Sequence, residues 1–224
     1  MSRVLPWSYS SLTAYETCPY RYQQERILKV TPKVVYKEAD EGVKKHAAIE
    51  HYLKGEKPLE DQDLKQLVDT TLAKLTTTNF KYEHKLAVTK DRQPCDWNDS
   101  DAYYRGILDV MYVDPASPNG AIYDWKNGKV NEYSEQLKAN SILVMAHYPH
   151  VNTVHTEYVW MRFNKTTPAK IFRDFSDAIW MKFVKRVDKL EEALQTDCWP
   201  KRTSGLCKKY CPVNNCEHNG AFNG

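Results

Sequence analysis

Hydrophobic positions follow a helical spacing in the first third of the chain and an alternating spacing from about residue 80. The helical spacing predicts helices over residues 8–26, 39–54 and 59–76, with Pro19 interrupting the first of them. From Phe80 to Val88, apolar and polar residues alternate, which is typical of a strand with one buried face.

The pattern then continues as a series of strands and helices. Strands are expected over residues 103–113, 121–126, 154–162 and 169–173, and helices over residues 133–147 and 176–195. This order predicts an α/β fold in which helices flank a mixed central sheet. We expect one domain over residues 1–224, with a core at about 37–196, N-terminal helices and a cysteine-rich tail at 197–224.

The composition is that of an ordinary folded protein, with 42% hydrophobic and 27% charged residues in a chain of 224. A formal net charge of only +3 neither requires nor excludes nucleic acid, because a local basic face is enough to bind phosphates. The first residues do not resemble a signal peptide, and no apolar run is long enough to span a bilayer. We therefore expect a cytoplasmic protein with reduced thiols and no membrane partner.

Two strands carry candidate catalytic acids. Asp109 lies in a stretch that is apolar on both faces, where an unpaired carboxylate is costly. In the next strand, Asp124 and Lys126 point to one face and Trp125 points to the other. A hairpin folded about Ser117 places Asp109 opposite a position within one residue of Asp124.

This trio alone is compatible with a buried Asp–Lys salt bridge and a second Asp that accepts backbone hydrogen bonds. However, two acids and one base leave an excess negative charge, which Mg²⁺ or Mn²⁺ would neutralise through oxygen ligands. On the helix at 39–54, Gly42, His46 and Glu50 share one face, and a neutral His46 imidazole is a candidate further ligand.

Four of the six cysteines crowd into the last part of the chain: Cys198, Cys207, Cys211 and Cys216. In a reducing compartment such a cluster favours a metal site over a disulfide framework. A closed thiolate site needs four ligands. Zinc held by the last three cysteines with His218 or Cys18 is one interpretation, and unligated reduced thiols are another.

The ordered set of motifs resembles the PD-(D/E)xK nuclease superfamily, specifically the RecB-like branch with an iron–sulfur cluster that includes the CRISPR-adaptation nucleases. The matching segments are Ser10-x-Leu12-x-x-Tyr15-x-x-Cys18-Pro19, Gly42-x-x-x-His46, Gly106-Ile-Leu-Asp109, Asp124-Trp-Lys126, Gln136-Leu137 and the last three cysteines. Two features depart from the family pattern. Asn140 stands where a Tyr is common, and the final cysteines are spaced C-x3-C-x4-C instead of C-x2-C-x5-C.

The resemblance implies a restriction-endonuclease-like core and a role for each matching residue. His46, Asp109, Asp124 and the backbone carbonyl of Trp125 would hold one or two Mg²⁺ or Mn²⁺ ions. Lys126 would position or deprotonate the attacking water and hold the scissile phosphate. Gln136 would orient Lys126 or contact the DNA backbone, and Glu50 would support the metal ligands without binding the metal itself. It also implies a [4Fe–4S] cluster on Cys18, Cys207, Cys211 and Cys216 that joins the helix at 8–26 to the tail.

The resulting hypothesis is a metal-dependent deoxyribonuclease. We expect an exonuclease of recombination, repair or phage DNA processing in a bacterial or phage-infected cell. The alternatives are a structure-specific or partner-dependent endonuclease and a non-catalytic Fe–S DNA-binding protein. Single-stranded DNA or DNA with free ends is the expected partner, together with a recombination protein or a second copy. Candidate DNA contacts are Tyr15, Arg21, Lys129 and Lys138, although the tyrosines could equally belong to the core and the lysines to a solvated face.

Overall fold

The computed structural model describes residues 6–32, 37–75, 80–132 and 134–221. They form two compact units, one made of Met1–Val35 with Met181–Gly224 and the other of Tyr36–Trp180. Over the described ranges, no helix combines the length and the apolar character needed to cross a membrane. The prediction of a single domain over 1–224 stays a prediction, and each unit is described here by itself.

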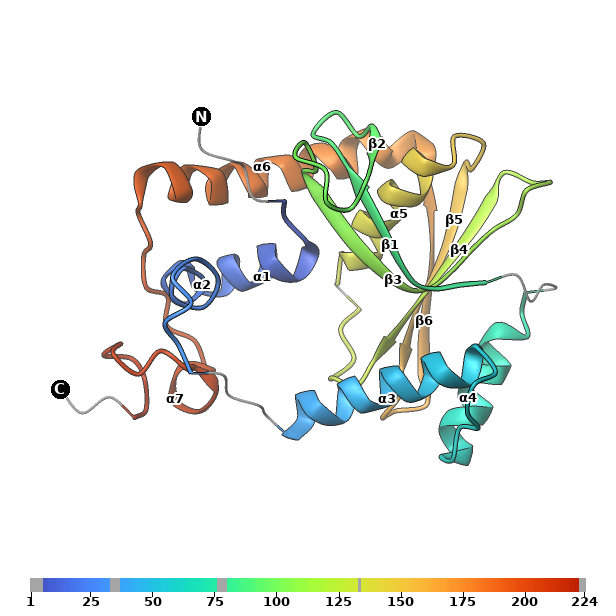
Figure 1. Cartoon of the computed structure of the whole chain (residues 1–224), viewed down its shortest axis with the longest axis horizontal. Coiled ribbons are helices and arrows are strands. Elements are labelled where there is room, and N and C mark those ends of the chain that lie inside the picture. Colours follow the sequence, from blue (N-terminus) through green and yellow to red (C-terminus); the bar gives the residue numbers. More distant parts are fainter. Residues whose placement is uncertain (1–5, 33–36, 76–79, 133, 222–224) are drawn as a thin grey trace. The chain divides into compact units, whose positions relative to one another are not determined.

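The larger unit is built on a six-stranded sheet with the strand order β2-β1-β3-β4-β5-β6 (Figure 1). Its strands are β1 (Lys81–Val88), β2 (Pro94–Cys95), β3 (Tyr104–Val113), β4 (Asn119–Lys126), β5 (Thr153–Trp160) and β6 (Lys165–Phe172). The β4–β5 pair is parallel and all other pairs are antiparallel, so the sheet is mixed. Helices flank this sheet, which confirms the predicted α/β class and agrees with a restriction-endonuclease-like core.

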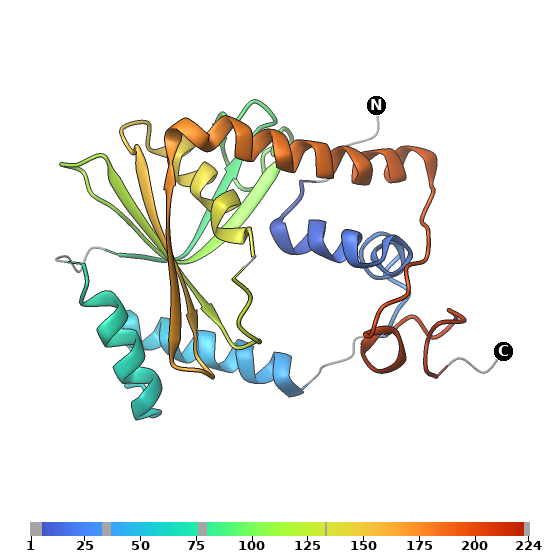
Figure 2. The same ribbon diagram turned by 180° about the vertical axis from the view of Figure 1, so that it is seen from behind.

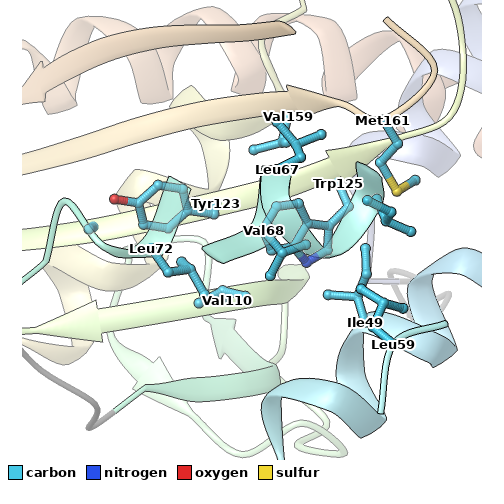
Figure 3. Packing of buried hydrophobic residues seen from close by; sticks show 12 residues of the cluster. Ile49, Leu59, Leu67, Val68, Leu72, Val110, Tyr123, Trp125, Val159 and Met161 are labelled. Atoms are coloured by element: carbon cyan, nitrogen blue, oxygen red, sulfur yellow. The ribbon is translucent and has the colours of Figure 1, made fainter. Parts of the chain in front are cut away.

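Helices α3 (Lys37–Leu53) and α4 (Gln62–Leu72) pack on one face of the sheet. Figure 3 shows the buried cluster that lies between these helices and the strands. The cluster holds apolar side chains from both helices and from three strands, among them Ile49, Val68, Val110, Trp125 and Val159. Burial of each such side chain contributes about 1.5–3 kcal/mol. This packing holds α3 against the strands that carry the candidate acids.

Helix α5 (Gln136–His147) covers the opposite face, which Figure 2 shows from behind. A Cβ atom on Gly106 of β3 would lie 2.6 Å from Leu143 Cδ1 and 2.8 Å from Asn140 Oδ1, so glycine permits this close approach. The buried Asn140 also accepts a hydrogen bond from the Tyr104 hydroxyl at 2.7 Å. Asn140, the position where the family often has Tyr, is therefore a packing residue between α5 and β3.

The pleat of β3 is interrupted between its two halves. Gly106 faces α5, whereas Val110 packs in the cluster under α4, although residues four apart in a regular strand share one face. On the neighbouring strand, Glu83 has a backbone φ of 44°, which is strained for a side chain other than glycine. The register places Glu83 opposite Asp109, between the pairs Tyr82–Val110 and His84–Leu108. The irregularity in the sheet thus falls at the candidate acid.

The smaller unit consists of short helices and the part of α6 from Met181 onwards. It contains α1 (Tyr9–Thr17), α2 (Pro19–Tyr22), the π-helix η1 (Gln23–Ile27), part of α6 (Ser176–Thr196) and α7 (Cys207–Tyr210). Ser8 caps α1 in a reciprocal pair of hydrogen bonds with Ser11. Tyr15 and Tyr22 pack with Leu190 and Ala193 of α6 in a small apolar core.

The helix expected over 8–26 is divided at Cys18, as the interruption at Pro19 predicted, because Pro19 starts a new helix there. Three other elements differ from the sequence prediction. β6 is longer than the strand expected at 169–173 and includes Pro168, which an edge strand tolerates. The polar stretch at 90–101, for which no strand was expected, contains the two-residue strand β2. The helix expected at 59–76 covers only 62–72, with Thr76 outside the described residues.

The close approach at Gly106 predicts the effect of one substitution. Gly106→Ala should lower the free energy of unfolding by about 1–3 kcal/mol, because a methyl group there overlaps Leu143 and Asn140. Chemical denaturation measures this change. Gly128→Ala is the matched control, since a Cβ at Gly128 meets nothing within 4 Å. Equal stability of both variants would contradict the close packing of β3 on α5.

Candidate metal centre

The hydrogen-bonded ladder between β3 and β4 ends at the pair Val110–Tyr123. Immediately beyond it, the Asp109 carboxylate accepts the Trp125 backbone N–H at 2.8 Å. A side chain thus takes the place of a main-chain partner, and the two strands part at this point. Asp109 lies opposite the region of Asp124, as the folded-hairpin argument predicted to within one residue.

Asp124, Lys126 and Gln136 form a closed set of contacts between β4 and the first turn of α5. Lys126 Nζ lies 2.6 Å from Asp124 Oδ2 and donates a hydrogen bond to Gln136 Oε1 at 2.9 Å. Gln136 Nε2 donates to Asp124 Oδ1, also at 2.9 Å. The Asp124 side chain is 3% exposed and that of Lys126 30%, so the acid is buried while the ammonium reaches solvent. Trp125 packs in the cluster on the other face, as the alternation predicted.

His46 reaches this point from α3. Its Nδ1 lies 3.5 Å from Asp109 Oδ2. Burial is the largest influence and lowers the pKa of His46 below its usual value, against the opposing effects of the Asp124 charge and of a hydrogen bond with the Trp125 backbone. The imidazole is therefore neutral near pH 7, which is the form that binds metals. A Cβ on Gly42 would lie 3.4 Å from Asn127 Cβ, which shows how closely α3 approaches the segment after β4.

Glu83 completes the group and is a site residue that sequence reasoning missed. Ligand atoms of His46, Glu83 and Asp109 all lie within 4.8 Å of one another, so together they could hold a metal ion. In the sequence Glu83 is one of several polar residues on an alternating strand, and nothing local distinguishes it. The signals that identify it are its register opposite Asp109 and its strained backbone, and both are visible only after folding.

The electrostatics of this group fit a divalent cation. Burial, followed by the charge of Asp124, raises the pKa of Asp109 well above its usual value. Burial also raises the pKa of Asp124 and of Glu83. Asp109 and Asp124 thus share the charge of Lys126, while Lys54 and Lys85 act on Glu83, and the raised pKa values show that these cations do not offset the cost of burying the carboxylates. Mg²⁺ or Mn²⁺ would supply the missing positive charge through oxygen ligands.

A cleft of about 590 Å³ opens beside this group. His46, Glu83, Asp109 and Lys126 line it with Arg162, and so do the exposed side chains of Val43 and Ile107. The arrangement offers a cation site, a solvent-reaching ammonium and open space for a substrate on the same side.

The other predicted residues of the larger unit lie farther from this group. Glu50 pairs with Lys54 on α3 at 2.5 Å, and its charge raises the pKa of Glu83. Lys129 is exposed in the segment after β4, and Lys138 lies 3.8 Å from Glu135 on α5. Glu50 therefore acts on Glu83 through its charge.

The two predicted DNA contacts of the smaller unit are differently placed. Tyr15 is buried, its hydroxyl donates to the Lys189 carbonyl at 2.8 Å, and its ring packs edge-on against Tyr22 and Trp199. This burial makes Tyr15 a packing residue with no exposed ring face for a base. Arg21 forms an ion pair with Glu25 at 3.1 Å.

Four of the five cysteines of the smaller unit gather around one cavity. Cys18, Cys207, Cys211 and Cys216 all line it, together with His218. Cys18 Sγ accepts backbone N–H groups from Arg21 and Arg202, both at 3.5 Å, and Cys207 Sγ accepts that of Ser204 at 3.3 Å. All six cysteines are free thiols, and Cys198 is exposed and does not line the cavity.

The fold and the first site define a class of protein: a mixed-sheet enzyme with carboxylates, an imidazole and a lysine around a cation site. The sequence profile of the PD-(D/E)XK nuclease superfamily matches residues 6–216. The chain therefore belongs to this superfamily, whose members are metal-dependent nucleases that act on DNA.

No curated protein matches the chain. Among solved structures, one titled "Crystal structure of SSO0001" aligns with a TM-score of 0.44 and 15% identity, over 92% of this chain and 82% of that one. This similarity is too low to support any statement about function.

The raised pKa of Asp109 predicts how the metal-free protein responds to pH. Because folding raises this pKa, the folded state keeps a proton that the unfolded state loses above about pH 3.8, the usual value. Stability without metal should therefore fall as the pH rises from there towards the raised pKa. In EDTA at neutral pH, Asp109→Asn should be more stable than the wild type by on the order of 1 kcal/mol, and the difference should vanish in acid.

Asp114→Asn is the matched control. The pKa of this exposed carboxyl is lowered by the backbone N–H of Ala116, so its removal should reduce stability at neutral pH instead. Added Mn²⁺ should raise the melting temperature of the wild type more than that of Asp109→Asn. Lower stability of Asp109→Asn in EDTA would show that Asp109 is a structural acid satisfied by the Trp125 N–H.

Proposed function

We propose that this chain is a Mg²⁺- or Mn²⁺-dependent exonuclease that shortens DNA from free ends during recombination, repair or phage DNA processing. The observation that carries the proposal is the convergence of His46, Glu83 and Asp109 beside the Asp124–Lys126–Gln136 set. A structural acid–base pair does not require a neutral imidazole and two carboxylates within reach of one ion, with a third, buried carboxylate beside them. Metal-dependent phosphodiester hydrolysis makes use of such a combination, because negative charge develops on the phosphate as water attacks.

Each residue has a role in the proposed reaction. In this proposal the metal would be held by Asp109, Asp124, His46 and the Trp125 carbonyl. Glu83 would be a further ligand, which the sequence did not indicate. A bound divalent ion lowers the pKa of its water and stabilises charge on the phosphate. Lys126 holds the scissile phosphate or takes the proton of the attacking water, and Gln136 fixes its ammonium by the 2.9 Å hydrogen bond.

The preference for free DNA ends rests on analogy with single-domain RecB-like nucleases. A structure-specific endonuclease or a non-catalytic DNA-binding protein would share the same fold. The intact set of acids and Lys126 favours a working enzyme over a degenerate one. Lys129, in the segment before α5, and Lys138, on α5, are the proposed contacts to the DNA backbone. A cytoplasmic site of action and a second copy or a recombination protein as partner belong to the same proposal.

For the smaller unit we propose a [4Fe–4S] cluster on Cys18, Cys207, Cys211 and Cys216. Support comes from the four thiols around one cavity and from the backbone N–H groups directed at Cys18 and Cys207. Hydrogen bonds to sulfur are a common feature of iron–sulfur sites and tune them. Burial is the main cause of the raised pKa of Cys211, and the charges of Cys207 and Cys18 raise it further, so these thiols lie close together. Zinc held by three of these cysteines with His218 is the alternative.

Digestion of labelled DNA tests the proposed activity. With Mg²⁺ or Mn²⁺, end-labelled linear DNA should be shortened and covalently closed circles should stay intact, and EDTA should stop the reaction. Labels at the 5′ or the 3′ end give the polarity. Cleavage of closed circles would instead identify an endonuclease.

Substitutions in the metal centre test the assigned roles. Asp109→Ala, Asp124→Ala and Lys126→Ala should each lower the cleavage rate at least about a hundredfold while DNA binding persists. Lys65→Ala is the matched control, because Lys65 pairs with Asp69 at the same 2.6 Å separation on the exposed side of α4. A Lys126→Ala enzyme that cleaves at the wild-type rate would remove Lys126 from the mechanism.

Metal analysis tests the cysteine site. Protein purified without oxygen should be brown and contain about four iron atoms per chain. Cys18→Ser and Cys216→Ser should lose most of this iron, whereas the exposed Cys198→Ser should keep it. Colourless protein with stoichiometric zinc would replace the cluster by a zinc site.

A further inference from the structure

Next to the candidate metal centre, strands β1 and β3 continue away from it side by side. On the outer face of this stretch, basic and apolar side chains lie together. Arg105 and Ile107 lie two residues apart on β3 and share the face turned away from α5, because Gly106 between them faces that helix. The register pairs Ile107 with Lys85 of β1, so these two side chains are neighbours on this face. Ile107 is 40% exposed and also lines the cleft with Asp109.

Trp97 extends this face from the loop after β2. The Lys85 ammonium lies 5.7 Å and the Arg105 guanidinium 5.5 Å from the centre of its ring. One indole thus contacts two cations from neighbouring strands. Together Ile107, Lys85, Arg105 and Trp97 form a continuous track, called here the β1–β3 track, that begins at the metal centre.

The cations of this track are not neutralised by ion pairs. Within the described part of the chain, neither Lys85 nor Arg105 forms a salt bridge or a side-chain hydrogen bond. The Arg105 Nε is buried and has no hydrogen-bond partner among those residues. Such a group costs free energy unless a ligand satisfies it. Acids do occur in the Trp97 loop, and the Asp99 carboxylate there accepts the N–H of Asp101 at 2.8 Å.

We propose that the β1–β3 track binds the single-stranded part of the DNA substrate next to the scissile phosphate. Lys85 and Arg105 contact phosphates, and bases stack on Trp97 and pack on Ile107. The proposal deepens the proposed function, on which it rests for the position of the scissile phosphate.

Two physical arguments favour a single strand over a duplex. Interleaved aromatic and cationic side chains suit unpaired bases, whose flat faces are free to stack, whereas paired bases in a duplex are already stacked. The track is also short. Four residues of β3 separate Asp109 from Arg105, a distance of about 13 Å at the rise of a β-strand. It therefore accommodates a few nucleotides of one strand.

Binding in EDTA tests the track independently of catalysis. Fluorescence anisotropy is measured with a labelled oligothymidylate of about 12 nucleotides and with a duplex of equal length. Trp97→Ala should weaken single-strand binding about fivefold or more, since it removes one base-stacking platform. Lys85→Gln removes one charge from an exposed side chain. The slope of log K against log[salt] should therefore become shallower by about 0.7, the value for one phosphate contact on a single strand.

The matched control removes a cation–aromatic pair of the same kind from the other end of β1. Lys81 Nζ lies 5.4 Å from the ring centre of Tyr148, and Tyr148→Ala should leave single-strand affinity unchanged. Circular dichroism and stabilisation by Mn²⁺ show that each variant keeps its fold and its metal centre.

Single-strand affinity within twofold of the wild type in both Trp97→Ala and Lys85→Gln would overturn the proposal. A loss confined to the duplex would overturn it as well. Because these measurements need no cleavage, an enzyme that fails to hydrolyse DNA with any metal would refute the proposed function and leave this test of the track intact.

Discussion

The buried Asp109 carboxylate is the constraint on which the rest of the site depends. It accepts the Trp125 N–H where the β3–β4 ladder ends, so the strands part and the neighbouring acids come within reach of His46. Burying this charge is costly, and Lys126 alone does not balance Asp109, Asp124 and Glu83. Helices on both faces of the sheet hold the strands in place despite this cost in free energy. A bound divalent cation would offset the cost.

The same irregularity explains how the candidate acid and the β1–β3 track share one strand. β3 changes the face that it turns towards α5 at Asp109. Before Asp109, Gly106 lies against α5, and after it, Val110 packs in the cluster under α4. As a result Ile107 and Arg105 face outwards next to the acid. A regular pleat would have placed them in the layer under α5. The strained backbone of Glu83 lies directly opposite this point, on the neighbouring strand β1.

In the smaller unit, one sequence motif supplies both a packing residue and a thiol of the cysteine-lined cavity. Tyr15 and Cys18 belong to one sequence motif, but they do different things. Tyr15 builds the apolar core with Tyr22 and α6, while Cys18 caps α2 and lines the cavity of the other three cysteines. The sequence interpretation of Tyr15 as a base contact relied on residue type and could not include the burial that α6, distant in sequence, provides.

The sequence by itself determined the features that depend on local geometry. Alternation placed Asp124 and Lys126 on one face and Trp125 on the other, the helical period placed His46 towards the sheet, and the turn after β3 set the hairpin that brings Asp109 near Asp124. Only the tertiary structure decided the role of Glu83, the burial of Tyr15 and the alignment of Lys85, Arg105 and Trp97. These depend on strand register and on contacts between distant segments, and neither is encoded in the spacing of residues along one element.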